Sequence, residues 1–99
     1  MEQEFSSFEE FWPYYLSLHR NPINRRLHLV GTTSALTCLA LGLLRSPKFL
    51  LATPVAGYAF AWAGHFFFEK NAPATFAYPL WSLRADFRMA ARMLARQLE

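Results

Sequence analysis

Two long apolar runs decide the fold: LHLVGTTSALTCLALGLL at Leu27–Leu44 and FLLATPVAGYAFAWAGHFFF at Phe49–Phe68. The runs hold 18 and 20 residues, none of which is Asp, Glu, Lys or Arg. At about 1.5 Å per residue, such helices reach roughly 27 and 30 Å, enough to cross the hydrocarbon core of a bilayer. Only the four residues RSPK at 45–48 join them. Because so short a link turns the second helix back along the first, we expect an antiparallel transmembrane hairpin.

Length and composition favour a membrane over a soluble core. The chain has 99 residues, of which 54% are hydrophobic, so it forms one domain. The alternative is a soluble bundle that buries both helices, but the roughly sixty residues outside the two runs are too few to cover them. The single cysteine, Cys38, excludes an intrachain disulfide framework.

We therefore expect an all-α integral membrane protein whose segments share a single domain at 1–99. The expected elements are an interfacial helix at 5–18, transmembrane helices at 24–44 and 49–69, and an amphipathic helix at 79–98. Helix-type spacing of polar and aromatic residues in both flanking segments supports the two outer helices.

The flanking segments carry helix signals of different kinds. Ser6 and Ser7 stand three residues before Glu9 and Glu10, a capping-box pattern. The apolar face that follows consists of Phe5, Phe8, Trp12, Tyr15 and Leu16. A basic stripe in the C-terminal segment consists of Arg84, Arg88, Arg92 and Arg96. Two interpretations of the stripe stay open: it lies on an anionic leaflet, or it is the solvated face of a helix that packs elsewhere.

The charge distribution predicts partners and orientation. A net charge of +3 is typical of proteins that bind nucleic acid or anionic lipid, and we favour lipid because the basic residues border apolar spans. Of the ten Lys and Arg residues, only Arg45 and Lys48 lie in the turn, which predicts that both termini are cytoplasmic. The preference for Arg over Lys is typical of GC-rich bacterial genomes, so we expect a bacterial inner membrane.

All three histidines of the chain converge on the cytoplasmic face of this hairpin. His28 lies 16 residues before Leu44, and His65 lies 16 residues after Phe49, so an antiparallel hairpin places the two at equal depth. His19 lies just outside the first span. Ionisable groups inside spans are costly and indicate function. The alternative is that each histidine is interfacial and bonded to a neighbour or a lipid headgroup.

A carboxylate accompanies this histidine group. Glu69 follows His65 by four residues and shares its side of the helix. Histidines with one carboxylate are the ligands of non-haem Fe(II) sites, and zinc accepts similar ligands. Glu69 and Lys70 are therefore candidate catalytic residues, although a polar helix end explains them equally well. Asp86 is a further candidate ligand, but its more ordinary role is to pair with an arginine of its own segment.

Small residues predict how the two spans touch. One stripe consists of His28, Gly31, Ala35, Cys38 and Gly42, and the other of Pro54, Gly57, Ala61 and Gly64. Such stripes let transmembrane backbones approach closely. Off this seam, hydroxyls at Thr33, Thr37 and Thr53 favour a second interface and hence a homodimer. The alternative is that these hydroxyls bond carbonyls of their own helices.

Two motifs resemble a known family. The first is His19-Arg20-Asn21-Pro22 with Asn24 and His28, and the second is GHFFFEKNAPA at 64–74. Both resemble the membrane-bound 2-hydroxy fatty acid dioxygenases of fungal phytosphingosine breakdown. The ending PATFAYPLWSL at 73–83 is similar to the bacterial branch, long grouped as a domain of unknown function.

The resemblance implies an Fe(II)-dependent membrane dioxygenase that shortens a 2-hydroxy fatty acid or related lipid by one carbon. It implies His19, His28 and His65 as iron ligands, with Glu69 as a further ligand or an adjacent group. The fungal enzymes are longer and carry another histidine-bearing stretch where this chain has a four-residue turn. The alternative function is a non-enzymatic membrane scaffold or lipid-binding protein.

Overall fold

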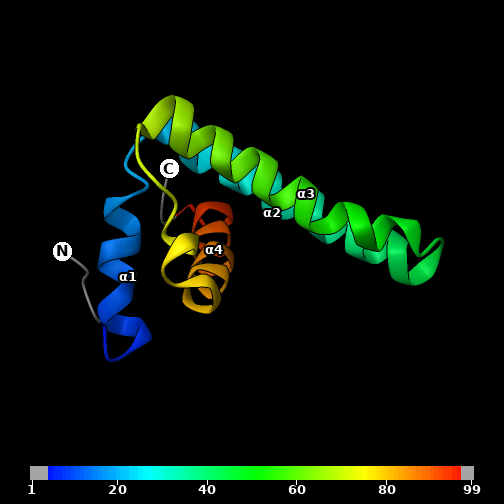
Figure 1. Cartoon of the computed structure of the whole chain (residues 1–99), viewed down its shortest axis with the longest axis horizontal. Helices are drawn as coiled ribbons and strands as arrows, with labels where there is room; N and C mark the ends of the chain where they lie inside the picture. The colour runs from blue at the N-terminus through cyan, green and yellow to red at the C-terminus, as the bar shows by residue number, and fades with distance from the viewer. Residues whose placement is uncertain (1–4, 97–99) are drawn as a thin grey trace.

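The computed structural model describes residues 5–96, which are helical and contain no strand (Figure 1). The elements are α1 (Phe8–Ser17), α2 (Pro22–Leu44), α3 (Lys48–Ala63), the π-helix η1 (Gly64–Glu69), the 3-10 helix η2 (Ala74–Phe76) and α4 (Pro79–Leu94). The all-α class expected from the sequence is therefore confirmed.

The longest helices form an antiparallel pair. α2 begins at Pro22, two residues before the expected start, because proline suits the first helical position and the Asn21 side chain accepts the N–H of Ile23 at 2.8 Å. α3 continues directly into η1, so the backbone is helical from Lys48 to Glu69. Figure 1 shows α2 and α3 lying side by side, with α1 and α4 gathered near one end of the pair.

Helix length supports a membrane span for α2. Within residues 5–96, α2 is the one helix that is long and apolar enough to cross a bilayer. α3 alone has 16 residues, fewer than a span requires, because its last turns change to the wider π-helical form of η1. Helix length therefore supports a membrane span for α2 alone, and the expected pair of transmembrane helices is not established by it.

Small residues bring the α2 and α3 backbones together, as the stripes predicted. A Cβ atom added to Gly31 would lie 2.8 Å from the carbonyl oxygen of Gly57 and 3.1 Å from Cβ of Phe60. A Cβ atom added to Gly57 would lie 3.6 Å from Cβ of Ala35, which is an ordinary van der Waals contact. The two backbones therefore meet at Gly31 with no room for a side chain.

α1 and α4 form a second packed unit beneath the long pair. The core consists of Phe8, Phe11, Trp12, Tyr15, Ala74, Ala85 and Met89. The capping pattern at the start of α1 is confirmed, since Ser7 Oγ accepts the N–H of Glu10 at 3.2 Å. α4 and η2 bury Phe8, Trp12 and Tyr15 of the apolar face of α1, so these side chains contact protein, and the interfacial placement of the helix stays a prediction.

The basic stripe of α4 lies against α1. The guanidinium of Arg84 stacks 4.1 Å from the Phe8 ring centroid, and Arg92 lies 5.3 Å from that of Trp12. Arg88 contacts both rings and forms a 3.0 Å ion pair with Glu9. The stripe thus matches neither interpretation in full: Arg84 and Arg92 are exposed, as a solvated face would be, yet their guanidinium groups also pack on aromatic rings of α1.

The threonine hydroxyls bond within their own helices. Thr33 donates to the carbonyls of Leu29 and Val30, both at 3.0 Å. Thr37 and Thr53 donate to the carbonyls four residues earlier, at 2.9 and 3.2 Å. The hydroxyls therefore need no partner across a second interface, and the homodimer stays a prediction without their support.

The close approach at Gly31 gives a matched pair of substitutions. We expect Gly31→Ala to lower the free energy of unfolding by about 1–3 kcal/mol, because the methyl group collides with backbone. Gly57→Ala meets only ordinary contacts and should be neutral or stabilising by up to about 1 kcal/mol. Thermal unfolding of both variants in mild detergent, followed by circular dichroism, measures the difference. Equal stability of the two would contradict the packing.

Candidate metal centre

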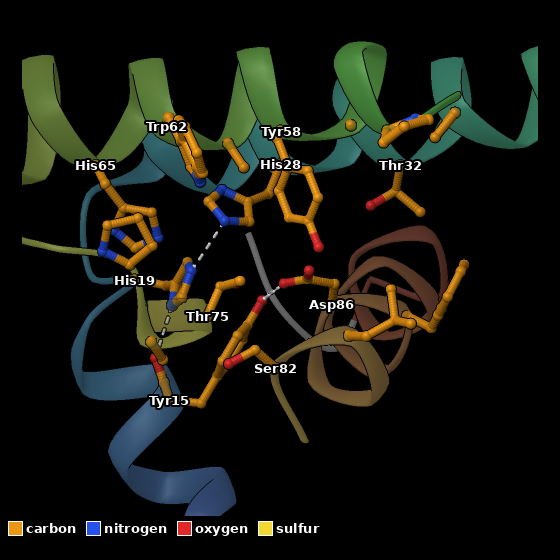
Figure 2. A pocket seen from close by; sticks show the side chains of 18 of the residues that line it. Tyr15, His19, His28, Thr32, Tyr58, Trp62, His65, Thr75, Ser82 and Asp86 are labelled. Carbon is orange, nitrogen blue, oxygen red and sulfur yellow. Dashed lines mark hydrogen bonds between the residues drawn. The ribbon is translucent and has the colours of Figure 1, made fainter. Parts of the chain in front are cut away.

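Three histidines from separate segments meet near one end of the α2–α3 pair (Figure 2). His19 lies in the loop between α1 and α2, His28 lies in α2, and His65 lies in η1. One ring nitrogen of each lies within 4.8 Å of the others, and the residues are only 1%, 5% and 1% exposed. The convergence expected from the sequence is confirmed. Three nitrogen donors this close and this well shielded from water form a candidate metal centre.

Hydrogen bonds fix the tautomers of two of the rings. Nδ1 of His19 lies 2.7 Å from the carbonyl oxygen of Tyr15, and Nδ1 of His28 lies 3.2 Å from that of Asn24. A carbonyl oxygen only accepts, so each Nδ1 carries a proton and donates it. Burial, reinforced by the nearby His28, lowers the pKa of His19 far below its ordinary value. His19 is therefore neutral, with its lone pair on Nε2.

Asn71 fixes the third ring in the same way. Its Nδ2 donates to the carbonyl of Leu18 at 3.1 Å, which sets the direction of the amide group. Its Oδ1 consequently faces Nδ1 of His65, at 2.7 Å. That oxygen accepts, so His65 also carries its proton on Nδ1 and leaves Nε2 as a donor atom.

The arrangement suits a cation between the rings. Nε2 of His19 lies 3.1 Å from Nε2 of His28, and the tautomers leave both atoms without a proton. Two lone pairs facing each other repel, whereas a positive ion between them would attract both. A set of neutral imidazole nitrogens suits Zn, Fe, Cu or Ni, so the donor chemistry fits a transition metal without identifying it.

The π-helical form of η1 sets the position of His65. The carbonyl of His65 accepts the N–H of Lys70 and, at 3.1 Å, that of Asn71. Lys70 adopts a left-handed conformation at φ 63°, which ends the helix and turns the chain back. Single π-helical turns are frequent at functional sites because they displace a side chain from the regular helical register. Here the turn brings Asn71 next to the ring that it orients.

Glu69 and Lys70 lie beside the histidines but outside the group. A carboxylate oxygen of Glu69 accepts the backbone N–H of Asn21, at the start of α2. Lys70 is exposed. Among the described residues, the group of potential ligands within 4.8 Å contains only the three histidines. The geometry thus shows Glu69 tying η1 to α2, and its role as a ligand, like the catalytic role of Lys70, stays a prediction.

A pocket of about 260 Å³ opens from the histidines along the seam between α2 and α3. On α2 it extends from His28 to Leu39, a length of roughly 17 Å at the helical rise. Apolar side chains dominate the far end, and Leu83 and Phe87 of α4 close one side. The pocket therefore has a polar end with metal-binding capacity and a long apolar end, a shape that matches a single-chain amphiphile.

Tyr15 and Asp86 form a polar pair at the side of the pocket. The Tyr15 ring stacks on His19 with centroids 4.0 Å apart, and its hydroxyl donates to Asp86 (Figure 2). The expected pairing of Asp86 with an arginine is wrong, because Tyr15 is its partner. Burial raises the pKa of Asp86 to about 6, although the Tyr15 hydrogen bond opposes the shift.

Sequence reasoning assigned no site role to Tyr15 or Asn71. Tyr15 precedes His19 by four residues, a spacing at which a side chain can bond a backbone carbonyl at a helix end. Many residue pairs have this spacing, so it does not identify a site residue. Asn71 belongs to the second motif, six residues after His65, a separation that regular helical geometry does not bring together. The π-helical turn is what brings the Asn71 side chain into contact with His65.

These features define a class: a helical protein in which a buried three-histidine centre opens into an apolar pocket. Residues 5–98 match the family described as 2-hydroxy-palmitic acid dioxygenase Mpo1-like. The match covers nearly the whole chain, and the protein belongs to this family, as the two sequence motifs indicated. No curated protein and no solved structure matches the chain.

Metal content tests the centre directly. We expect His19→Ala, His28→Ala and His65→Ala each to lose the metal that the wild-type protein retains after anaerobic loading with Fe(II), as measured by elemental analysis. Asn71→Ala removes the acceptor that orients one ring and should lower metal affinity roughly 10–100-fold.

Two further variants act as controls. Cys38→Ala removes a thiol outside the centre and should retain full metal content. Glu69→Gln decides whether that carboxylate is a fourth ligand, since glutamine keeps an oxygen for the Asn21 N–H. Wild-type metal content in every histidine variant would contradict the site.

Proposed function

We propose that this protein is an Fe(II)-dependent membrane dioxygenase that shortens a 2-hydroxy fatty acid or a related lipid by one carbon. The observation that carries the proposal is the position of three histidine nitrogen donors, within 4.8 Å of one another, at the polar end of a long apolar pocket. The family description names a 2-hydroxy-palmitic acid dioxygenase, which supports the same chemistry.

In this proposal, separate sets of residues bind the metal and the acyl chain. His19, His28 and His65 would hold the metal as neutral donors and leave coordination positions open for the acid head and O₂. When bound, Fe(II) supplies the activation of O₂. The apolar walls around Leu36 and Phe87 receive the acyl chain and exclude water. The overall change balances with O₂ as the sole oxidant: the hydroxy acid and O₂ give the shortened acid, CO₂ and water.

The membrane arrangement is also proposed. Only 17% of the most apolar window of α2 is buried, whereas the core helix of a soluble protein is mostly buried. The unbroken helix formed by α3 and η1 has the length of a second span, and Leu51, Val55 and Phe67 on it are 66–80% exposed. We infer two antiparallel spans in a bacterial inner membrane, with both termini and the metal centre on the cytoplasmic side.

Activity is tested with reconstituted protein and long-chain 2-hydroxy acids. We expect mass spectrometry to detect the acid one carbon shorter only when O₂ is present. Chelation should abolish the product, and Fe(II) rather than Zn(II) should restore it, because zinc has no redox chemistry. If metal-loaded protein forms no product at any chain length, the alternative of a non-catalytic lipid-binding protein would replace the enzyme.

Topology is tested by cysteine labelling. After Cys38→Ala, single cysteines placed at Ser46 in the turn and at Ser17 in α1 should react with an impermeant reagent from opposite sides of the inner membrane. We expect the Ser46 position to label in intact spheroplasts and the Ser17 position only after lysis. Labelling of both from one side would contradict two spans.

A further inference from the structure

The α4 wall of the pocket carries polar groups that the metal centre does not use. Ser82 and Asp86 lie one helical turn apart on α4, and both line the pocket (Figure 2). The other α4 residues at this wall, Leu83 and Phe87, are apolar. A polar position in an otherwise apolar wall needs a reason, because burying such a group without a partner destabilises the fold.

Ser82 lacks that partner within the protein. The residue is 1% exposed, and its Oγ forms no hydrogen bond with any residue in the range 5–96. A buried hydroxyl left unbonded destabilises the fold. The serine therefore does not stabilise the fold by itself. A polar group that enters the pocket could supply the hydrogen bond that its Oγ lacks.

Asp86 has spare hydrogen-bonding capacity at the same place. The Tyr15 hydroxyl donates to Oδ1, and this is the one hydrogen bond that the Asp86 side chain forms within residues 5–96. Oδ2 remains available to a donor. A carboxylate repels another carboxylate, so this wall does not suit the acidic head of a fatty acid. It suits a hydroxyl group, which donates to Asp86 and also exchanges a hydrogen bond with Ser82.

Tyr15 shows how near this wall is to the metal centre. One face of its ring stacks on His19, and the hydroxyl on the same ring bonds Asp86. A single aromatic side chain therefore separates the candidate ligands from the carboxylate. A ligand whose head occupies the metal centre brings the carbon atoms next to that head alongside Asp86 and Ser82.

We propose that Asp86 and Ser82 bind a hydroxyl group that the substrate carries close to its metal-binding head, and that this pair selects hydroxylated over unsubstituted acyl chains. The inference rests on the proposed function, since it takes the occupant of the pocket to be a fatty acid held at the metal. It assigns the selection to two specificity-determining residues that do not bind the metal.

Equilibrium binding tests the assignment without turnover. Full-length protein in nanodiscs is loaded with Fe(II) under anaerobic conditions, and radiolabelled 2-hydroxy and unsubstituted acids of equal chain length are titrated, with empty nanodiscs subtracted. We expect the wild-type protein to bind the hydroxy acid about tenfold or more tightly than the unsubstituted acid. Asp86→Ala should abolish the preference, and Ser82→Ala should reduce it.

Matched variants separate selection from general binding. Leu83→Ala, on the same wall, should weaken both acids equally, because it removes apolar contact alone. Asp86→Asn keeps an acceptor oxygen and should retain part of the preference. The metal content and helical circular dichroism of each variant show whether it is folded. If Asp86→Ala does not fold, Ser82→Ala and Asp86→Asn still test the site.

The outcomes distinguish this inference from the proposed function. Equal affinity of the wild-type protein for both acids, with iron bound, would overturn the hydroxyl site and leave the lipid-binding metal centre in place. A preference unchanged in the folded variants would also overturn it. Failure of iron-loaded wild-type protein to bind either acid would overturn both proposals.

Discussion

The orientation of three imidazole rings is the constraint on which the rest of this structure depends. Each ring donates from Nδ1 to an oxygen of the chain, so the three Nε2 lone pairs are directed into one small space. Such hydrogen bonds fix both the tautomer and the direction of a ligand. Two of the acceptors are helical carbonyls four residues before their histidines, and the third is the Asn71 amide. Local helical geometry thus supplies two ring orientations, and tertiary packing supplies the last.

That third contact also holds the helices together around the centre. Asn71 bonds His65 through its oxygen and the end of α1, at Leu18, through its nitrogen. Glu69 in turn accepts the N–H of Asn21. These bonds connect the end of η1 to the loop that carries His19 and to the start of α2. The polar residues of the second motif therefore act together: they fasten three segments at the point where the histidines meet.

The sequence predicted the helical class, the close seam between the apolar runs and the convergence of the histidines, because each follows from helical periodicity and chain direction. It did not predict the partners of Tyr15 or Asp86, which lie 71 residues apart in the chain. Periodicity carries no information about such a contact. The same limit applies to the aromatic face of α1. Its periodicity predicted an apolar face but not that α4 covers it, with Arg84 and Arg88 stacked on Phe8.

The choice of neutral ligands has an electrostatic consequence for what the pocket can hold. A divalent ion held by the three neutral imidazoles alone would keep its double charge, whereas a carboxylate ligand would halve the net charge. In a site this well shielded from water, an uncompensated charge is costly, so a metal-loaded centre would favour an anionic partner, which the carboxylate head of the proposed fatty acid would supply. Asp86, on the far side of the Tyr15 ring, disfavours a second anion beside the first. For the proposed lipid ligand, the two effects together would set the order of groups: an anion at the histidines, a neutral donor at the α4 wall, and an apolar chain beyond.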